Sequence, residues 1–157
     1  MITKNQTDYQ ATIVVHKNAK DTFDAINQVS AWWTRNTRGN THKKGDKFTV
    51  QFGETYSDFE IIEMTEHQKI KWLVLDCNLH WMKDKKEWKG TEILWEITPL
   101  NGASEIHMTH IGLGPQIECF EDCTKGWNHY VKESLFKLIN EGKGAPDDPN
   151  HSARDRE

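Results

Sequence analysis

The hydrophobic repeat of this chain changes once, and that change limits the folds open to it. Up to about residue 111, apolar and polar side chains alternate in six segments, with the period of two typical of half-buried β-strands: residues 9–16, 47–52, 56–65, 70–77, 91–98 and 104–111. From about Gln116 the spacing lengthens to three or four residues and continues to Gly142 and Gly144. This second pattern predicts one long amphipathic helix at the C-terminal end.

The segments between the strands indicate how the strands connect. Short polar connections such as residues 53–54 and 66–68 predict hairpins, whereas residues 34–44 and 78–90 predict longer loops. Residues 19–27 have helical spacing, and a second short helix carries Trp32 and Trp33. Strands followed by a separate helix predict an α+β fold, with a curved antiparallel sheet of six to seven strands wrapped around the C-terminal helix. A cavity is expected where sheet and helix diverge.

The chain length and its end composition predict the domain organisation. A chain of 157 residues fits one domain, which we place at residues 1–144. Residues 145–157 are polar and contain Pro146 and Pro149, so they are expected to form a disordered tail.

Charge, hydropathy and cysteine content exclude several classes of protein. The net charge of −4 argues against a general nucleic-acid binder, and no apolar run approaches the roughly 18 residues of a membrane span. The first ten residues are polar and predict no secretory signal. Cys77, Cys119 and Cys123 are odd in number and lack framework spacing, which indicates reduced thiols and a cytoplasmic location.

Several local motifs resemble one known family. They are the amphipathic opening of residues 19–26 before Trp32-Trp33, Lys89-Gly90-Thr91 leading into the strand with Trp95, the segment 109–113, and Gly126-Trp127 and Ser134-Leu135 in the final helix. With these residues the chain resembles the START-like or SRPBCC superfamily over residues 7–144. It is most similar to small bacterial domains grouped with the C-terminal half of the activator of heat-shock-protein ATPase. The resemblance implies the helix-grip fold, but such relatives include lipid carriers, polyketide cyclases, hormone-binding proteins and co-chaperone domains.

Seven tryptophans are an unusual number for this length, and their large rings suit either a core or a ligand cavity. Any one ring can be explained by core packing, but together they favour a cavity lining. We expect the cavity to be lined by Trp33, Phe48, Phe52, Phe59, Trp72, Trp81, Trp95, Met108, His110, Cys123, Trp127 and Tyr130. Trp81 and Trp88 lie in the charged loop of residues 78–90, where they either gate the cavity mouth or cap the edge of the core.

His110 is the one catalytic candidate. It shares a strand face with Ile106 and Met108, so its side chain is expected to point inward. Inside a pocket it would serve as a polar anchor or, with Tyr130, as an acid–base group. The alternative is a structural histidine hydrogen-bonded to a backbone carbonyl.

Cys119 and Cys123 are four residues apart on one side of the predicted helix. Together with His110 they raise the question of a metal site, but the spacing is not that of a zinc knuckle and no fourth ligand is evident. They are expected to be small buried residues, without a disulfide, because their Cβ directions match poorly at helical spacing. No metal or cofactor is therefore expected. Glu118, Glu121 and Asp122 are expected on the solvated side of the helix.

Three functions follow from these expectations. The first is non-catalytic binding of a small hydrophobic or amphipathic molecule in the cavity. The second is a protein-interaction module of the co-chaperone kind, as the resemblance implies. The third is a cyclase-type enzyme that uses His110. The expected partners are a small hydrophobic molecule and, in the second case, a protein, with no nucleic acid, and the chain itself is expected to be a monomer or a weak homodimer.

Overall fold

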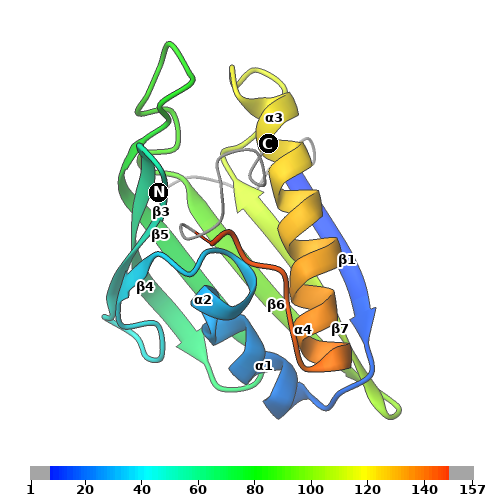
Figure 1. The fold of residues 1–157 in the computed structure, drawn as a ribbon. Coiled ribbons are helices and arrows are strands. Elements are labelled where there is room, and N and C mark those ends of the chain that lie inside the picture. The colour runs from blue at the N-terminus through cyan, green and yellow to red at the C-terminus, as the bar shows by residue number, and fades with distance from the viewer. Residues whose placement is uncertain (1–7, 149–157) are drawn as a thin grey trace.

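Seven antiparallel strands form one sheet that curves around the C-terminal helix in the computed structural model, which describes residues 8–148 (Figure 1). The strands are β1 (Tyr9–Val15), β2 (Thr37–Gly39), β3 (Lys47–Phe52), β4 (Thr55–Thr65), β5 (Lys69–Asn78), β6 (Glu92–Leu100) and β7 (Ala103–Ile111). Their order in the sheet is β1-β7-β6-β5-β4-β3-β2. Hairpins join consecutive strands from β2 to β7, and β1 pairs with β7. The predicted α+β helix-grip fold is confirmed.

The sequence predicts a loop over residues 34–44, but the structure has the strand β2 at Thr37–Gly39. Its three residues are too few to show an alternating pattern, yet they pair with β3 in the register Thr37↔Val50 to Gly39↔Phe48. Gly39 has φ 100°, and a Cβ there would lie 2.3 Å from the Lys47 carbonyl oxygen. Only glycine therefore allows the two backbones to approach so closely at this edge.

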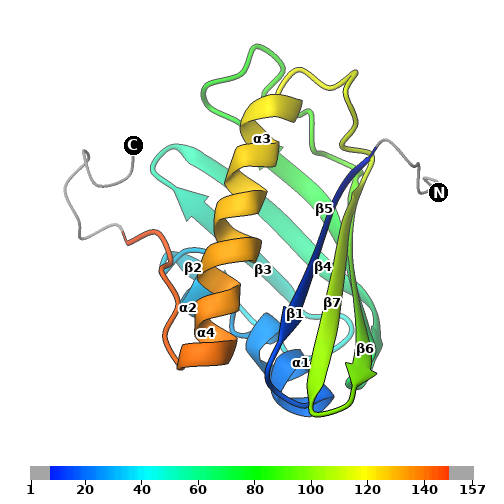
Figure 2. The same ribbon diagram turned by 90° about the vertical axis from the view of Figure 1, so that its right-hand side faces the viewer.

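Two short helices follow β1, as predicted: α1 (Ala19–Asn27) and α2 (Val29–Trp32). The Asn18 side chain caps α1 by accepting a hydrogen bond from the Asp21 backbone N–H at 2.8 Å. The C-terminal helix crosses the inner face of the curved sheet, with α1 and α2 near its C-terminal end (Figures 1 and 2).

The C-terminal helix consists of three consecutive segments. These are α3 (Phe120–Trp127), the π-helical segment η1 (Asn128–Leu135) and α4 (Phe136–Glu141). Gly142, with φ 84°, ends the helix in the left-handed conformation. The prediction of a long amphipathic helix is confirmed, but its π-helical middle was not anticipated.

The π-helical segment matches an unusual periodicity in the sequence. Every fourth residue along this part of the chain is buried, namely Cys119, Cys123, Trp127, Val131, Leu135 and Ile139. An α-helix turns about 100° per residue, so a four-residue step overshoots a full turn by about 40° and five steps by about 200°. An unbroken α-helix would thus turn part of this row away from the sheet. A π-helix has more residues in each turn, so each residue turns the helix by a smaller angle. The π-helical segment therefore offsets the overshoot of the α-helical segments and keeps the row buried.

Tryptophan rings form the centre of the core between sheet and helix. Trp32, Trp72 and Trp95 are almost fully buried, and Trp33 packs against Trp32, Trp72 and Trp127. Ring contacts connect six of the seven tryptophans into one cluster, which we call the indole cluster: Trp32, Trp33, Trp72, Trp88, Trp95 and Trp127.

The expectation of a disordered tail from Ala145 onward is wrong for residues 145–148, and residues 149–157 lie outside the described part of the chain. Asp147 forms a parallel bridge with Thr34. Its N–H donates to the Trp33 carbonyl at 2.9 Å, and its own carbonyl accepts from the Arg35 N–H at 2.8 Å. Residues 145–148, which we call the C-terminal strap, dock through backbone hydrogen bonds and an ion pair between Arg35 Nε and Asp148 Oδ2 at 3.4 Å, so their lack of apolar side chains does not indicate the docking.

Candidate ligand-binding cavity

A cavity of about 300 Å³ opens between the start of the C-terminal helix, the β3–β4 hairpin and the loop of residues 79–90, which we call the mouth loop. Half of its twelve lining residues are aromatic, and the full lining consists of Trp33, Phe52, Thr55, Ser57, Leu79, Trp81, Trp88, Asp122, Cys123, Gly126, Trp127 and Tyr130. The cavity therefore lies at the end of the helix where α3 begins.

Six of the twelve residues expected from the sequence line this cavity: Trp33, Phe52, Trp81, Cys123, Trp127 and Tyr130. The other six are packed in the core, each with no more than 3% of its surface exposed: Phe48, Phe59, Trp72, Trp95, Met108 and His110. Ring contacts explain their burial: Phe48 and Phe59 pack against Trp72, whereas Trp95 and His110 pack against Trp127 of the helix. Among the lining residues that were not expected, Leu79, Asp122 and Gly126 come from the mouth loop and from α3.

Gly126 leaves part of the cavity open. It lies in α3 between Asp122 and Tyr130, which are one helical turn away on either side and also line the cavity. A Cβ built on Gly126 would meet no atom within 4 Å. Close packing therefore does not explain the glycine, although glycine inside a helix costs about 1 kcal/mol relative to alanine. An open cavity at this position does explain it.

Trp81 and Trp88 occupy different positions in the mouth loop. Trp81 is 48% exposed, and its Nε1–H donates a hydrogen bond to Asp122 Oδ2 at 3.3 Å, which joins the loop to α3 across the mouth. Trp88 is 8% exposed and stacks on Trp127 with the ring planes 4° apart. Of the two alternatives left open by the sequence, Trp81 takes the mouth and Trp88 both caps the core and lines the cavity.

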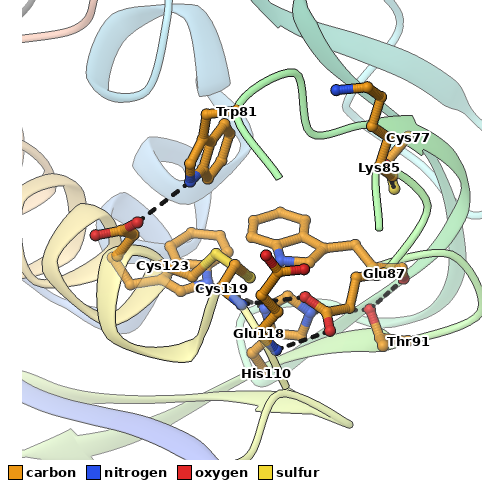
Figure 3. Close-up of a disulfide and its surroundings, with 12 residues drawn as sticks. Cys77, Trp81, Lys85, Glu87, Thr91, His110, Glu118, Cys119 and Cys123 are labelled. Carbon is orange, nitrogen blue, oxygen red and sulfur yellow. Dashed lines mark hydrogen bonds between the residues drawn. A yellow bond between two sulfur atoms is a disulfide. The ribbon is translucent and has the colours of Figure 1, made fainter. Parts of the chain in front are cut away.

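Hydrogen bonds accepted by two glutamates connect the mouth loop to the segment before α3 (Figure 3). The Glu87 carboxylate accepts hydrogen bonds from the backbone N–H groups of Glu118 at 2.8 Å and Cys119 at 3.1 Å. In return, the Glu118 carboxylate accepts from the backbone N–H of Asp84 at 3.3 Å. Glu118 therefore holds the loop rather than facing only solvent, as the sequence had suggested.

Cys119 and Cys123 form a disulfide beside the cavity (Figure 3), which makes the expectation of two reduced thiols wrong. The helix begins at Phe120, so Cys119 is its N-cap residue, with ψ 4° instead of a helical value. The Cα–Cβ bond of Cys119 therefore does not point in the direction it would have inside a helix, which is the direction that the sequence analysis assumes. The Cα–Cα distance of 5.6 Å between the two cysteines suits a disulfide. Cys77 is free and buried. Because disulfides persist mainly in oxidising compartments, the disulfide removes one reason for the cytoplasmic location, which stays a prediction.

His110 points inward, as its strand parity predicts, but it lies behind the cavity wall. Trp127 Nε1–H donates to His110 Nδ1 at 3.0 Å, and an indole nitrogen can only donate, so Nδ1 carries no proton. The neutral ring thus has its proton on Nε2, which lies 2.9 Å from Thr91 Oγ1. Thr91 in turn donates to the Trp88 carbonyl at 2.6 Å. Complete burial lowers the pKa of His110 to about 3, which keeps the ring neutral.

The His110 network is structural in its geometry. It fixes the indole ring of Trp127, which lines the cavity, and holds the end of the mouth loop through Thr91. Tyr130 lines the cavity itself, and burial, helped by the charge of Asp147, raises the pKa of its hydroxyl to about 12. That hydroxyl therefore stays protonated and can donate a hydrogen bond to a ligand.

Residues 8–148 contain no group of three or more histidine, cysteine, aspartate or glutamate side chains placed to hold a metal ion. Within the same residues, no helix has both the length and the apolar character needed to cross a membrane.

Comparison with known proteins gives the family of the chain. The solution structure of the Aha1 dimer from Colwellia psychrerythraea matches with a TM-score of 0.71 at 18% identity, covering 87% of this chain and 98% of that one. Protein MLL2253 from Mesorhizobium loti matches with a TM-score of 0.65 at 13% identity, covering 83% and 96%. DynU16, from the dynemicin biosynthetic locus, matches with a TM-score of 0.63 at 15% identity, covering 89% of this chain and 49% of DynU16. At these identities the matches show the fold alone.

The sequence comparisons go further than the structural ones. No curated protein matches the chain. A family model described as Activator of Hsp90 ATPase homolog 1-like protein matches residues 21–140, well over half of the sequence. The chain therefore belongs to the Activator of Hsp90 ATPase homolog 1-like family, within the START-like superfamily that its motifs resemble.

Proposed function

We propose that this protein binds a small hydrophobic or amphipathic molecule in the cavity between sheet and helix, without catalysing a reaction on it. The observation that carries the proposal is the aromatic cavity with a helical glycine facing into it. Small-molecule sites are typically mostly apolar concavities of roughly 300–1,000 Å³ with a few polar groups. The volume of about 300 Å³ is at the small end of that range, and Thr55, Ser57 and Tyr130 supply hydroxyl groups.

The arrangement of polar groups favours binding over catalysis. His110 does not line the cavity, and its ring nitrogens are engaged by Trp127 and Thr91. Cys123 is held in a disulfide, and the Tyr130 hydroxyl stays protonated. The described lining residues thus include no nucleophile paired with a base, which a cyclase-type reaction would use.

The co-chaperone-like alternative has less support in this structure. Among residues 8–148 the exposed large hydrophobic side chains are Val14, Trp81 and Leu100, which belong to β1, the mouth loop and β6. Val14 and Leu100 lie near one end of the sheet, on two strands that both pair with β7, and Trp81 lies in the mouth loop. Two neighbouring side chains do not make the larger apolar patch that an interaction surface of this type would need. The Colwellia neighbour is a dimer, so we also propose self-association as a property to measure by light scattering.

Titration with N-phenyl-1-naphthylamine, a neutral fluorescent dye, tests the proposal. The wild type should bind the dye saturably at one site. Gly126→Leu should weaken binding about tenfold or more, because a leucine at this position would grow into space that is empty within 4 Å of its Cβ. Lys125→Leu is the matched control, since Lys125 lies next in the same helix with its side chain 73% exposed and does not line the cavity. Absence of saturable binding to the wild type, or unchanged binding to Gly126→Leu, would contradict the proposal.

A further inference from the structure

The lining of the cavity contains one acidic side chain and no basic one. Asp122 is the sole ionisable acid or base among its twelve lining residues apart from the protonated Tyr130 and the disulfide-bonded Cys123. No lysine, arginine or histidine is in the lining. Asp122 lies at the mouth, where Trp81 Nε1–H holds its carboxylate at 3.3 Å. An anionic group entering here would meet a negative charge and no cation to balance it.

Three lysines near the mouth form contacts outside the cavity. Lys85 Nζ donates to the backbone carbonyls of His80 and Met82 inside the loop, at 2.6 and 3.2 Å. Lys86 pairs with Asp76 at 3.1 Å, and Lys125 lies 3.8 Å from Glu121. These ion pairs and hydrogen bonds keep the three positive groups out of the cavity lining. Lys83 and Lys89, also in the mouth loop, have exposed side chains and do not line the cavity either, so Asp122 is the one charged residue of its lining.

The walls of the cavity suit a cation as well as a hydrocarbon. Six of the lining residues are aromatic: Trp33, Phe52, Trp81, Trp88, Trp127 and Tyr130. The face of an aromatic ring carries partial negative charge and attracts a cation within about 6 Å, most strongly for tryptophan. Aromatic walls with a carboxylate at the rim are the combination that binds ammonium groups, because the rings replace water around the nitrogen and the carboxylate balances its charge.

We propose that the ligand, whose binding is itself proposed above, is a cationic amphiphile. It would carry a tertiary or quaternary ammonium nitrogen on an apolar body. The nitrogen would lie at the mouth, near Asp122 and the ring of Trp81. The apolar body would lie deeper, against Trp127 and Tyr130.

Three probes of the same shape class test the sign of the charge. Benzyltrimethylammonium is the cation, neopentylbenzene is its neutral isostere with carbon in place of nitrogen, and phenylacetate is the anion. Each displaces N-phenyl-1-naphthylamine from the wild type. We expect the cation to bind about tenfold more tightly than the neutral isostere, a difference of roughly 1.4 kcal/mol, and the anion to bind most weakly.

Asp122→Asn removes the charge but keeps an oxygen that can accept the Trp81 hydrogen bond. It should abolish most of the cation's advantage over neopentylbenzene, measured as the ratio of the two affinities on the same variant, so that a general change in affinity cancels from the comparison. Glu121→Gln is the matched control, because Glu121 is the neighbouring carboxylate, 86% exposed and outside the lining. It should keep the preference for the cation.

The outcomes separate this inference from the proposed function. If the dye and the neutral isostere bind but the cation gains nothing, or if Asp122→Asn keeps the full preference, the cationic ligand is wrong and hydrophobic binding stands. If neither the dye nor any probe binds the wild type, both proposals fail. Circular dichroism and thermal unfolding of each variant show whether a loss of affinity comes from the site or from unfolding.

Discussion

Replacing Gly126 by alanine should make this protein more stable. Gly126 lies in α3 with a conformation that alanine can adopt, and an added Cβ meets no atom within 4 Å, so there is neither a clash nor a new packing contact. The remaining effect on the free energy of unfolding comes from backbone conformational entropy, which favours alanine over glycine inside a helix by about 0.8–1.0 kcal/mol. For a chain of this size, that corresponds to a rise in melting temperature of about 2–4 °C. Urea unfolding followed by circular dichroism measures the free energy directly.

Gly142→Ala is the control that tests the reasoning. A Cβ there also meets no atom within 4 Å, but Gly142 has φ 84° and ends the helix in the left-handed region. Alanine should therefore destabilise the protein by about 1–2 kcal/mol. If Gly126→Ala proves neutral or destabilising, the space around Gly126 is filled in solution and the glycine is not kept for a cavity. If it stabilises, the wild type gives up stability to keep the cavity open, as functional sites commonly do.

Three further outcomes are expected. Truncation after Gly144 should cost about 2–4 kcal/mol of unfolding free energy, because it removes three hydrogen bonds of the C-terminal strap and the Arg35–Asp148 ion pair; a loss below about 0.5 kcal/mol in urea unfolding would refute the docking. Because burial lowers the pKa of His110 to about 3 while the unfolded chain protonates near 6.5, its contribution to stability is complete above pH 6.5 and is lost as the pH falls. The wild type should therefore lose stability relative to His110→Gln below pH 6.5, by at most about 1.4 kcal/mol per pH unit, and a difference that does not vary with pH would contradict this. In unfolded, unreduced protein, a thiol reagent should detect one cysteine, and three after reduction of the Cys119–Cys123 disulfide; three without reduction would show that the disulfide is absent.

The alternating pattern predicted the strands because each pairs through its backbone and buries one face. The bounds of β3 are as predicted, and the inward direction of His110 follows from strand parity alone. The same pattern could not tell cavity from core. Phe48 and Phe52 share a face of β3, yet Phe48 is 3% exposed in the core and Phe52 lines the cavity. That distinction depends on the distance between sheet and helix at each point, which no local periodicity records.

Two other features depended on where the final helix starts and how tightly it winds. The disulfide was missed because Cys119 was placed inside the helix, although it precedes the first helical residue. The π-helical segment did leave a signal, because the buried row from Cys119 to Ile139 repeats every four residues, a longer period than an α-helix accommodates. The C-terminal strap leaves no such signal in the sequence, because backbone hydrogen bonds can be formed by almost any residue type.

The indole cluster makes the protein an optical reporter of its own cavity. Neighbouring rings in the cluster have centroids 4.8–6.5 Å apart, close enough for excitation energy to pass from ring to ring before it is emitted. The six indoles therefore emit as one unit, and a quencher beside Trp33, Trp88 or Trp127 in the cavity darkens all of them. No ring contact within residues 8–148 joins Trp81 to this unit, and its ring is partly exposed, so its own emission is expected at longer wavelength. The ratio of the two emissions distinguishes a ligand held deep in the cavity from one that touches only its mouth.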